Sequence, residues 1–185
     1  MILADGSALG EPEQHAARMT RTGAAIGSLV FAVAQPGVMA GLVPYWLTGG
    51  WRPAGAPLVL QVAGAVLVVA GLGALAHTVI HFVVEGLGTP SPIAPTRSLV
   101  VGGLYRYVRN PMYLAVVAII LGQAAILGRA TLLGYAAIFW IVVASFVRFY
   151  EEPMLSGRYG EQYAAYRRAV RAWWPRLTPW RTPER

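Results

Sequence analysis

Four long apolar runs constrain the fold of this chain more than any other feature. The runs cover residues 22–47, 58–84, 112–127 and 131–150. About 20 apolar residues are enough to cross a bilayer as a helix. Hydrophobic residues make up 56% of the chain and charged residues only 12%, unlike an ordinary globular protein. The sequence therefore predicts an all-α integral membrane bundle of about four transmembrane helices, forming one domain over residues 22–185 after a polar tail at 1–21.

The shortest connection decides which polar residues can meet. Only residues 128–130 separate the third run from the fourth, so these helices are expected to form a tight antiparallel hairpin. The hairpin would bring Arg109, before the third helix, to the same membrane face as Glu151 and Glu152, after the fourth. A site is predicted where these three residues meet.

Two features of the first run bear on helix packing. Pro36 predicts a kink in the helix. Glycines recur at every fourth position, which either allows a neighbouring helix to approach closely or reflects the abundance of glycine in the chain. These glycines are Gly23, Gly27, Gly37 and Gly41.

The positive charge of the chain follows its expected topology. The net charge is +7, and all fifteen basic residues are arginines, thirteen of them in the tails, the second connecting loop and the end of the fourth run. The opposite side carries only Arg52 and Arg129. By the positive-inside rule, both termini and the intervening polar motif face the cytoplasm. Because the arginines flank apolar runs, we expect a membrane and no nucleic acid as partner.

The polar stretch Gly102–Tyr113 reads Gly-Gly-Leu-Tyr-Arg-Tyr-Val-Arg-Asn-Pro-Met-Tyr. Its two arginines and three tyrosines lie at the edge of an apolar run, where a bilayer tolerates few polar groups. The absence of cysteine and lysine excludes thiolate and Schiff-base chemistry. The stretch predicts polar chemistry at the membrane surface.

The C-terminal region predicts a helix over residues 158–174 that lies along the membrane interface. Its aromatic and apolar residues fall on one stripe at helical spacing. They are Tyr163, Tyr166, Val170, Trp173 and Trp174.

Three polar residues end the second run at a spacing of four: His77, His81 and Glu85. Side chains at this spacing share one helix face and could ligate a metal ion. A polar helix end that faces water or a cleft explains the same pattern without a metal ion. We therefore predict no metal site.

Three motifs in order carry a family resemblance. They are Gly103–Tyr113, then Glu151-Glu152-Pro-Met-Leu155, then Tyr159-Gly-Glu-Gln-Tyr163-Ala-Ala-Tyr166. Over residues 86–175 the chain resembles the superfamily of isoprenylcysteine carboxyl methyltransferases and phospholipid methyltransferases, in its bacterial type. The resemblance implies a membrane enzyme of the bacterial inner membrane that uses S-adenosylmethionine at its cytoplasmic face.

The resemblance also implies roles for residues. The expected cofactor-binding residues are Tyr105, Arg109, Asn110, Pro111, Tyr113, Glu151 and Glu152. Carboxylates suit the ammonium of the cofactor, and an arginine with an amide suits its carboxylate. Glu152 is expected to be catalytic as a base for an amine acceptor, and Arg168, or its neighbour Arg167, to orient an anionic acceptor.

Two positions depart from the family pattern. Asn110 stands where the family has histidine, and Ala115 where it has glycine. Asparagine does not titrate near neutral pH, so proton transfer at that position is lost while a binding role is kept.

The sequence is compatible with more than one methyl acceptor and more than one function. A lipophilic acceptor is expected, either the carboxylate of an isoprenylcysteine-like compound or the amine of a phospholipid. A non-enzymatic membrane scaffold or transport subunit with a degenerate site is the alternative from another class. A metal oxidoreductase built on His77 and His81 ranks below both, because the chain offers too few ligands. The sequence does not determine the oligomeric state.

Overall fold

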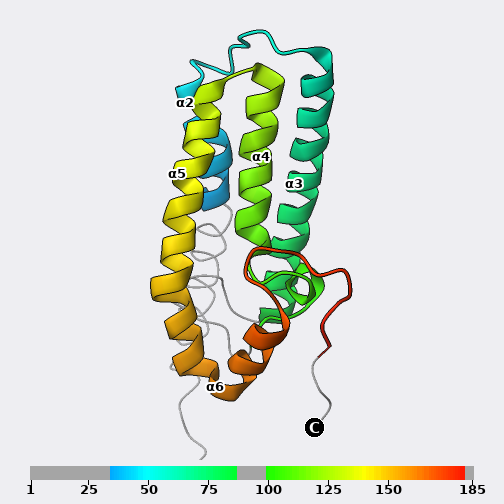
Figure 1. The fold of residues 1–185 in the computed structure, drawn as a ribbon, viewed down its shortest axis with the longest axis vertical. Coiled ribbons are helices and arrows are strands. Elements are labelled where there is room, and N and C mark those ends of the chain that lie inside the picture. The colour runs from blue at the N-terminus through cyan, green and yellow to red at the C-terminus, as the bar shows by residue number, and fades with distance from the viewer. Residues whose placement is uncertain (1–33, 87–98, 182–185) are drawn as a thin grey trace, which may run out of the picture.

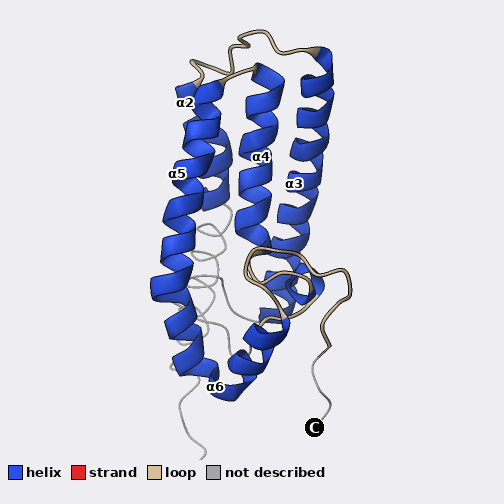
Figure 2. Cartoon of the chain, viewed as in Figure 1, coloured by secondary structure: helices blue, strands red, loops and turns tan. Residues whose placement is uncertain are grey.

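The computed structural model describes residues 34–86 and 99–181, with the backbone alone for residues 82–86. The described part is helical and contains no strand (Figure 2). The elements are η1 Val38–Leu42, α2 Val43–Leu47, α3 Leu58–Gly86, η2 Gly103–Arg106, α4 Pro111–Leu127, α5 Ala130–Phe146, η3 Val147–Glu151 and α6 Glu152–Ala169. The predicted all-α class is confirmed. The tail at 1–21 and residues 22–33 of the first span lie outside the described residues.

Among the described residues, two helices are long and apolar enough to cross a membrane. One covers Leu58–His81, and the other is the apolar first part, before Arg148, of the helical stretch Ala130–Ala169, which is interrupted at Gly160. Only 11% and 22% of their most apolar windows are buried inside the protein, whereas the core helix of a soluble protein would be mostly buried. Their exposed apolar surface therefore matches a lipid environment. The apolar helix α4 has 17 residues, and four membrane spans in total stay a prediction.

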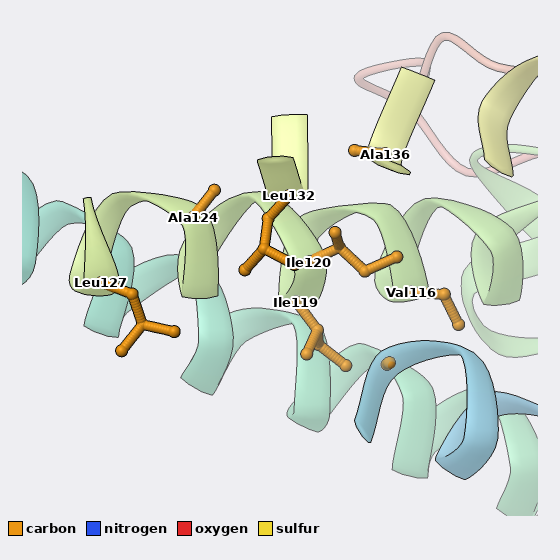
Figure 3. Packing of buried hydrophobic residues seen from close by; sticks show 8 residues of the cluster. Val116, Ile119, Ile120, Ala124, Leu127, Leu132 and Ala136 are labelled. Carbon is orange, nitrogen blue, oxygen red and sulfur yellow. The ribbon is translucent and has the colours of Figure 1, made fainter. Parts of the chain in front are cut away.

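Helix α4 is the centre of the bundle, flanked by α3 and α5 (Figure 1). Its buried side chains meet those of α5 and η1 in one cluster (Figure 3). The cluster is Ala40, Val116, Ile119, Ile120, Ala124, Leu127, Leu132 and Ala136. Ile120 and Leu132 are fully buried there.

Helices α3 and α4 approach closely at glycines. A Cβ placed on Gly64 would lie 2.5 Å from the carbonyl oxygen of Gly122, and one on Gly122 would lie 2.6 Å from that of Gly64. A Cβ on Gly71 would lie 3.0 Å from the carbonyl oxygen of Ala115. Gly37 and Gly41, by contrast, would meet nothing within 4 Å. The close helix contact is therefore formed by the second and third predicted spans and not at these two glycines.

The first helix departs from regular geometry between its two prolines. Residues Val38–Leu42 form a π-helical turn in which the Val43 amide donates to the Val38 carbonyl. Pro44 follows and has no amide hydrogen to donate. The free carbonyls are satisfied by neighbouring helices: Gln123 Nε2 donates to the Ala40 carbonyl at 2.6 Å, and Tyr135 Oη donates to the Met39 carbonyl at 2.8 Å. The irregular turn thus lies just before Pro44, while the predicted kink was placed near Pro36.

The two ends of the bundle differ. At one end, Gly128 ends α4 in the left-handed conformation with φ of +65°, and Arg129 leads directly into α5. The predicted tight hairpin is confirmed. At the other end, α6 is interrupted at Gly160, with φ of +49°, and ends at Ala169.

The predicted interfacial helix over 158–174 is wrong at its C-terminal end. Val170 has extended backbone, and residues 170–181 form an irregular segment that folds back over η2 (Figure 1). We call residues 170–181 the C-terminal strap. Helical periodicity failed here because the strap is held by contacts with distant parts of the chain.

We predict that Gly64→Ala lowers the stability of the protein by about 1–3 kcal/mol, because the new methyl group overlaps the backbone of α4. Gly73→Ala, in the same helix, has open space and should be neutral or stabilising, since alanine favours helix over glycine. Thermal unfolding in detergent micelles measures both. Equal melting temperatures for the two variants would contradict the close contact.

We predict that Gln123→Leu costs about 1–3 kcal/mol, because the carbonyl of Ala40 loses its donor inside the bundle. Gln61→Leu is the matched control, since its bond to the Ala56 carbonyl is exposed at the end of α3. The same unfolding measurement compares the two. A Gln123 variant as stable as the Gln61 variant would show that the carbonyl finds another donor.

Candidate active site

Gly103 allows the polar motif to pack closely against the end of α3. Gly103 begins η2 with φ of +50°, and a Cβ there would lie 2.8 Å from His77 Nε2 and 2.8 Å from His81 Cδ2. The two histidine rings lie 4.4 Å apart, centroid to centroid. The described residues contain no group of three or more side chains able to hold a metal ion, and the side chain of Glu85 lies outside them. The histidines thus form a surface against which the motif packs.

The C-terminal strap holds the motif by backbone hydrogen bonds. The amide of Arg109 donates to the Arg171 carbonyl at 3.0 Å. The amide of Arg176 donates to the Tyr107 carbonyl, and that of Trp180 to the Arg106 carbonyl, both at 2.9 Å. These bonds fix the position of the residues that lead into α4.

A buried ion pair joins the start of α4 to the start of α6. Arg109 Nη1 lies 2.8 Å from Glu152 Oε1, and the two side chains are only 11% and 7% exposed. The same nitrogen donates to Tyr163 Oη at 3.0 Å. Two exposed arginines approach the other carboxylate oxygen, Arg167 at 3.1 Å and Arg148 at 3.9 Å. Three guanidinium groups therefore surround one carboxylate, and the cluster carries excess positive charge.

Two buried polar atoms in this cluster lack a hydrogen bond within the described part of the chain. They are Arg109 Nε and Glu152 Oε2. Arg167 is close enough to Oε2 for charge attraction, but its geometry is not that of a hydrogen bond. Buried polar atoms are almost always satisfied in proteins, so a donor without a hydrogen bond beside an acceptor that has only ion-pair contacts makes this cluster the candidate ligand site.

The second carboxylate of the pair has a different environment. Glu151 Oε2 accepts a long hydrogen bond from Tyr113 Oη at 3.4 Å, and no arginine among the described residues lies within ion-pair distance of it. Burial raises the pKa of the Glu151 carboxyl, the Tyr113 bond opposes that rise, and the charge of Glu152 adds to it. Burial, and then the charge of Glu151, raise the pKa of Tyr105, so this phenol stays neutral.

The structure brings most of the predicted site residues together. Arg109 and Glu152 are in contact, Tyr113 contacts Glu151, and the charge of Glu151 acts on Tyr105. Pro111 is the first residue of α4 and is buried. Asn110 is buried and donates to the Ala172 carbonyl at 3.2 Å, so its amide group supports the strap.

Arg168 is not brought to the cluster. Its side chain is 70% exposed and pairs with Glu161, which is 92% exposed, at 3.7 Å. Its neighbour Arg167 points to Glu152 instead. Consecutive helix residues point about 100° apart, so only one of the two arginines can face the site.

The sequence reasoning missed Arg148, Tyr163 and two tryptophans near the site. Arg148 precedes Glu152 by one helical turn, and a helix continuing past the predicted end of the fourth span would have indicated this pair. Trp140 and Trp173 lie 4.5 Å apart, centroid to centroid, although 33 residues separate them. No local pattern predicts that contact, because the helical spacing of Val170 and Trp173 in the sequence does not correspond to a helix in the strap.

The described residues form an all-α bundle with exposed apolar helices and a charged, partly buried cluster at one end. A comparison with protein families matches residues 56–162 to the family described as phospholipid methyltransferase. The chain therefore belongs to the phospholipid methyltransferase family, and the predicted resemblance is confirmed. A search of curated proteins and a search of solved structures each gave no match. The protein is a membrane methyltransferase that uses S-adenosylmethionine.

The residues present fit this cofactor. The free donor of Arg109 suits a carboxylate, and Glu151, without an ion pair in the described chain, suits a cationic group. S-adenosylmethionine carries both kinds of group and supplies a methyl group on a sulfonium. The cluster therefore offers a positive group, Arg109, for the carboxylate of the cofactor and a negative group, Glu151, for a cationic group of the cofactor.

We predict that Glu152→Gln lowers stability by about 3–5 kcal/mol, because it leaves the buried charge of Arg109 without its partner. Glu161→Gln breaks the exposed pair with Arg168 and should cost less than about 1 kcal/mol. Thermal unfolding in detergent compares the two variants. Similar small losses for both would mean that water reaches Arg109.

Proposed function

We propose that this enzyme methylates the amine of a phospholipid headgroup at the cytoplasmic face of the membrane. One observation carries the proposal: adjacent carboxylates in different charge environments. Glu152 is surrounded by three arginines, whereas Glu151 has a tyrosine as its partner. A zwitterionic headgroup carries a phosphate, which suits the arginines around Glu152, and an amine, which suits Glu151.

The cofactor is assigned to the buried part of the cluster. Arg109 and Glu152 supply the free donor and acceptor, and Tyr105, Tyr113 and Glu151 line the neighbouring space. Asn110 and Pro111 act by setting the backbone at the start of α4. Asn110 needs no proton-transfer role, which is consistent with asparagine in place of the family histidine.

The acceptor phosphate is assigned to the exposed side of the cluster. Arg148 and Arg167 have side chains that are 66% and 45% exposed, so they can reach a lipid headgroup while they remain near Glu152. This assignment replaces Arg168 by Arg167. Both arginines lie beyond the apolar part of α5, at the level where phosphates of a bilayer lie.

Proton transfer is assigned to Glu151. An amine gives up a proton in the course of methylation, and a carboxyl group with a raised pKa is better suited to take it than one held by three arginines. A carboxylate acceptor, such as an isoprenylcysteine-like compound, would need no base. The environment of Glu151 therefore favours an amine acceptor. Glu151 replaces Glu152 as the proposed catalytic base.

The orientation follows from charge. The motif, α6 and the strap lie at the same end of the bundle, opposite the loop that carries Arg52 and the turn at Arg129 (Figure 1). The arginine-rich end is placed in the cytoplasm by the positive-inside rule.

We predict that the purified protein binds S-adenosylhomocysteine and that Glu151→Gln lowers methyl transfer to phosphatidylethanolamine at least about tenfold while the protein stays folded. Calorimetry measures the binding, and transfer of a labelled methyl group measures the activity. Glu161→Gln, which removes the same charge from an exposed site, is the control.

Transfer to an isoprenylcysteine analogue, with none to phosphatidylethanolamine, would overturn the amine assignment. Absence of cofactor binding in a folded, monodisperse sample would overturn the assignment of the cluster. Unchanged activity in Glu151→Gln would remove Glu151 from proton transfer.

A further inference from the structure

A row of aromatic rings extends from Glu151 into the bundle. Tyr113, whose hydroxyl group contacts Glu151, lies 6.5 Å from Trp173, with the ring planes tilted by 49°. Trp173 in turn lies 4.5 Å from Trp140, with a tilt of 55°. The row joins three separate parts of the chain: α4, the C-terminal strap and α5.

The row begins at the charged cluster, where Tyr113 contacts Glu151, and ends at Trp140 of α5. Trp140 precedes Glu151 by about three helical turns along the same helix. All three rings are partly exposed, so they can contact a bound molecule. Trp174, the neighbour of Trp173 in the strap, is 74% exposed. The strap therefore presents one of its two adjacent tryptophans to the bundle.

Aromatic faces beside a carboxylate attract organic cations. A cation within about 6 Å of a ring centroid is stabilised by the negative face of the ring, most strongly over tryptophan. The arginines near the row are directed to Glu152, and the described chain places Arg158 over Tyr159 rather than an arginine over these three rings. Glu151 supplies a counter-charge that no described arginine neutralises within ion-pair distance.

We propose that Tyr113 and Trp173, supported by Trp140 and flanked by Glu151, form a binding site for an organic onium group. This inference rests on the proposed function, which supplies two such groups. One is the sulfonium of the cofactor, and the other is the methylated ammonium of the lipid headgroup. Both are cations with apolar methyl surface, and the same aromatic binding site suits either.

The test compares matched pairs of ligands that differ by the onium group. S-adenosylmethionine and S-adenosylhomocysteine differ by the methyl group that makes the sulfonium. Dihexanoyl phosphatidylcholine carries a trimethylammonium in its headgroup, whereas dihexanoyl phosphatidylglycerol carries a neutral glycerol there, and both are added without cofactor. Calorimetry gives the four affinities for wild type, Trp173→Leu, Trp173→Phe and Trp174→Leu.

Trp173→Leu should lower the preference for the charged member of one pair by about tenfold. A loss confined to the first pair identifies the sulfonium as the ligand, and a loss confined to the second identifies the ammonium. Trp173→Phe should restore most of the preference, and Trp174→Leu should behave as wild type. A merely structural tryptophan would weaken both members of a pair equally.

Unchanged preferences in Trp173→Leu, with normal binding of S-adenosylhomocysteine, would overturn the onium site and leave the proposed function intact. A wild-type protein that binds neither pair of ligands would overturn both. A Trp173→Leu variant that does not fold is replaced by Trp140→Leu, which removes the ring that packs against Trp173. The same preference is then measured.

Discussion

The buried ion pair between Arg109 and Glu152 is the interaction on which the arrangement of this protein depends. Two charges that are 11% and 7% exposed are costly to remove from water, and the pair is stable only when its geometry is held firmly. The short turn at Gly128 and Arg129 holds α4 beside α5, and the helix runs on from α5 to Glu152. The charged site is therefore a consequence of how the apolar helices connect.

The sequence predicted that Arg109 and the two glutamates lie close together, and the structure adds that Arg109 pairs with Glu152. Two apolar runs with almost no residues between them must be antiparallel, so the polar residues at their far ends meet. The strap was not predictable in the same way. It is attached by backbone bonds from residues such as Arg176 and Trp180, and backbone bonds leave no pattern of side chains. Helical periodicity therefore extended the last helix about five residues too far.

Helix packing shows a similar limit. A spacing of four between glycines indicates that a helix could be approached closely, but not which helix does so. Gly64 and Gly122 meet across α3 and α4, while Gly37 and Gly41 have open space beside them. The distinction depends on helix rotation, which a single sequence does not determine. Gln123 likewise reads as an isolated polar residue in an apolar run until the free carbonyl of Ala40 is known.

The separation of roles between Glu151 and Glu152 follows from helix geometry. Adjacent residues on a helix point about 100° apart, and the π-helical turn η3 ends at Glu151. One carboxylate therefore points to Arg109, while the other points to Tyr113. Two equivalent carboxylates would repel each other and share one environment. The turn of the helix instead gives one a structural partner and leaves the other beside the aromatic row, where a cationic ligand would balance its charge.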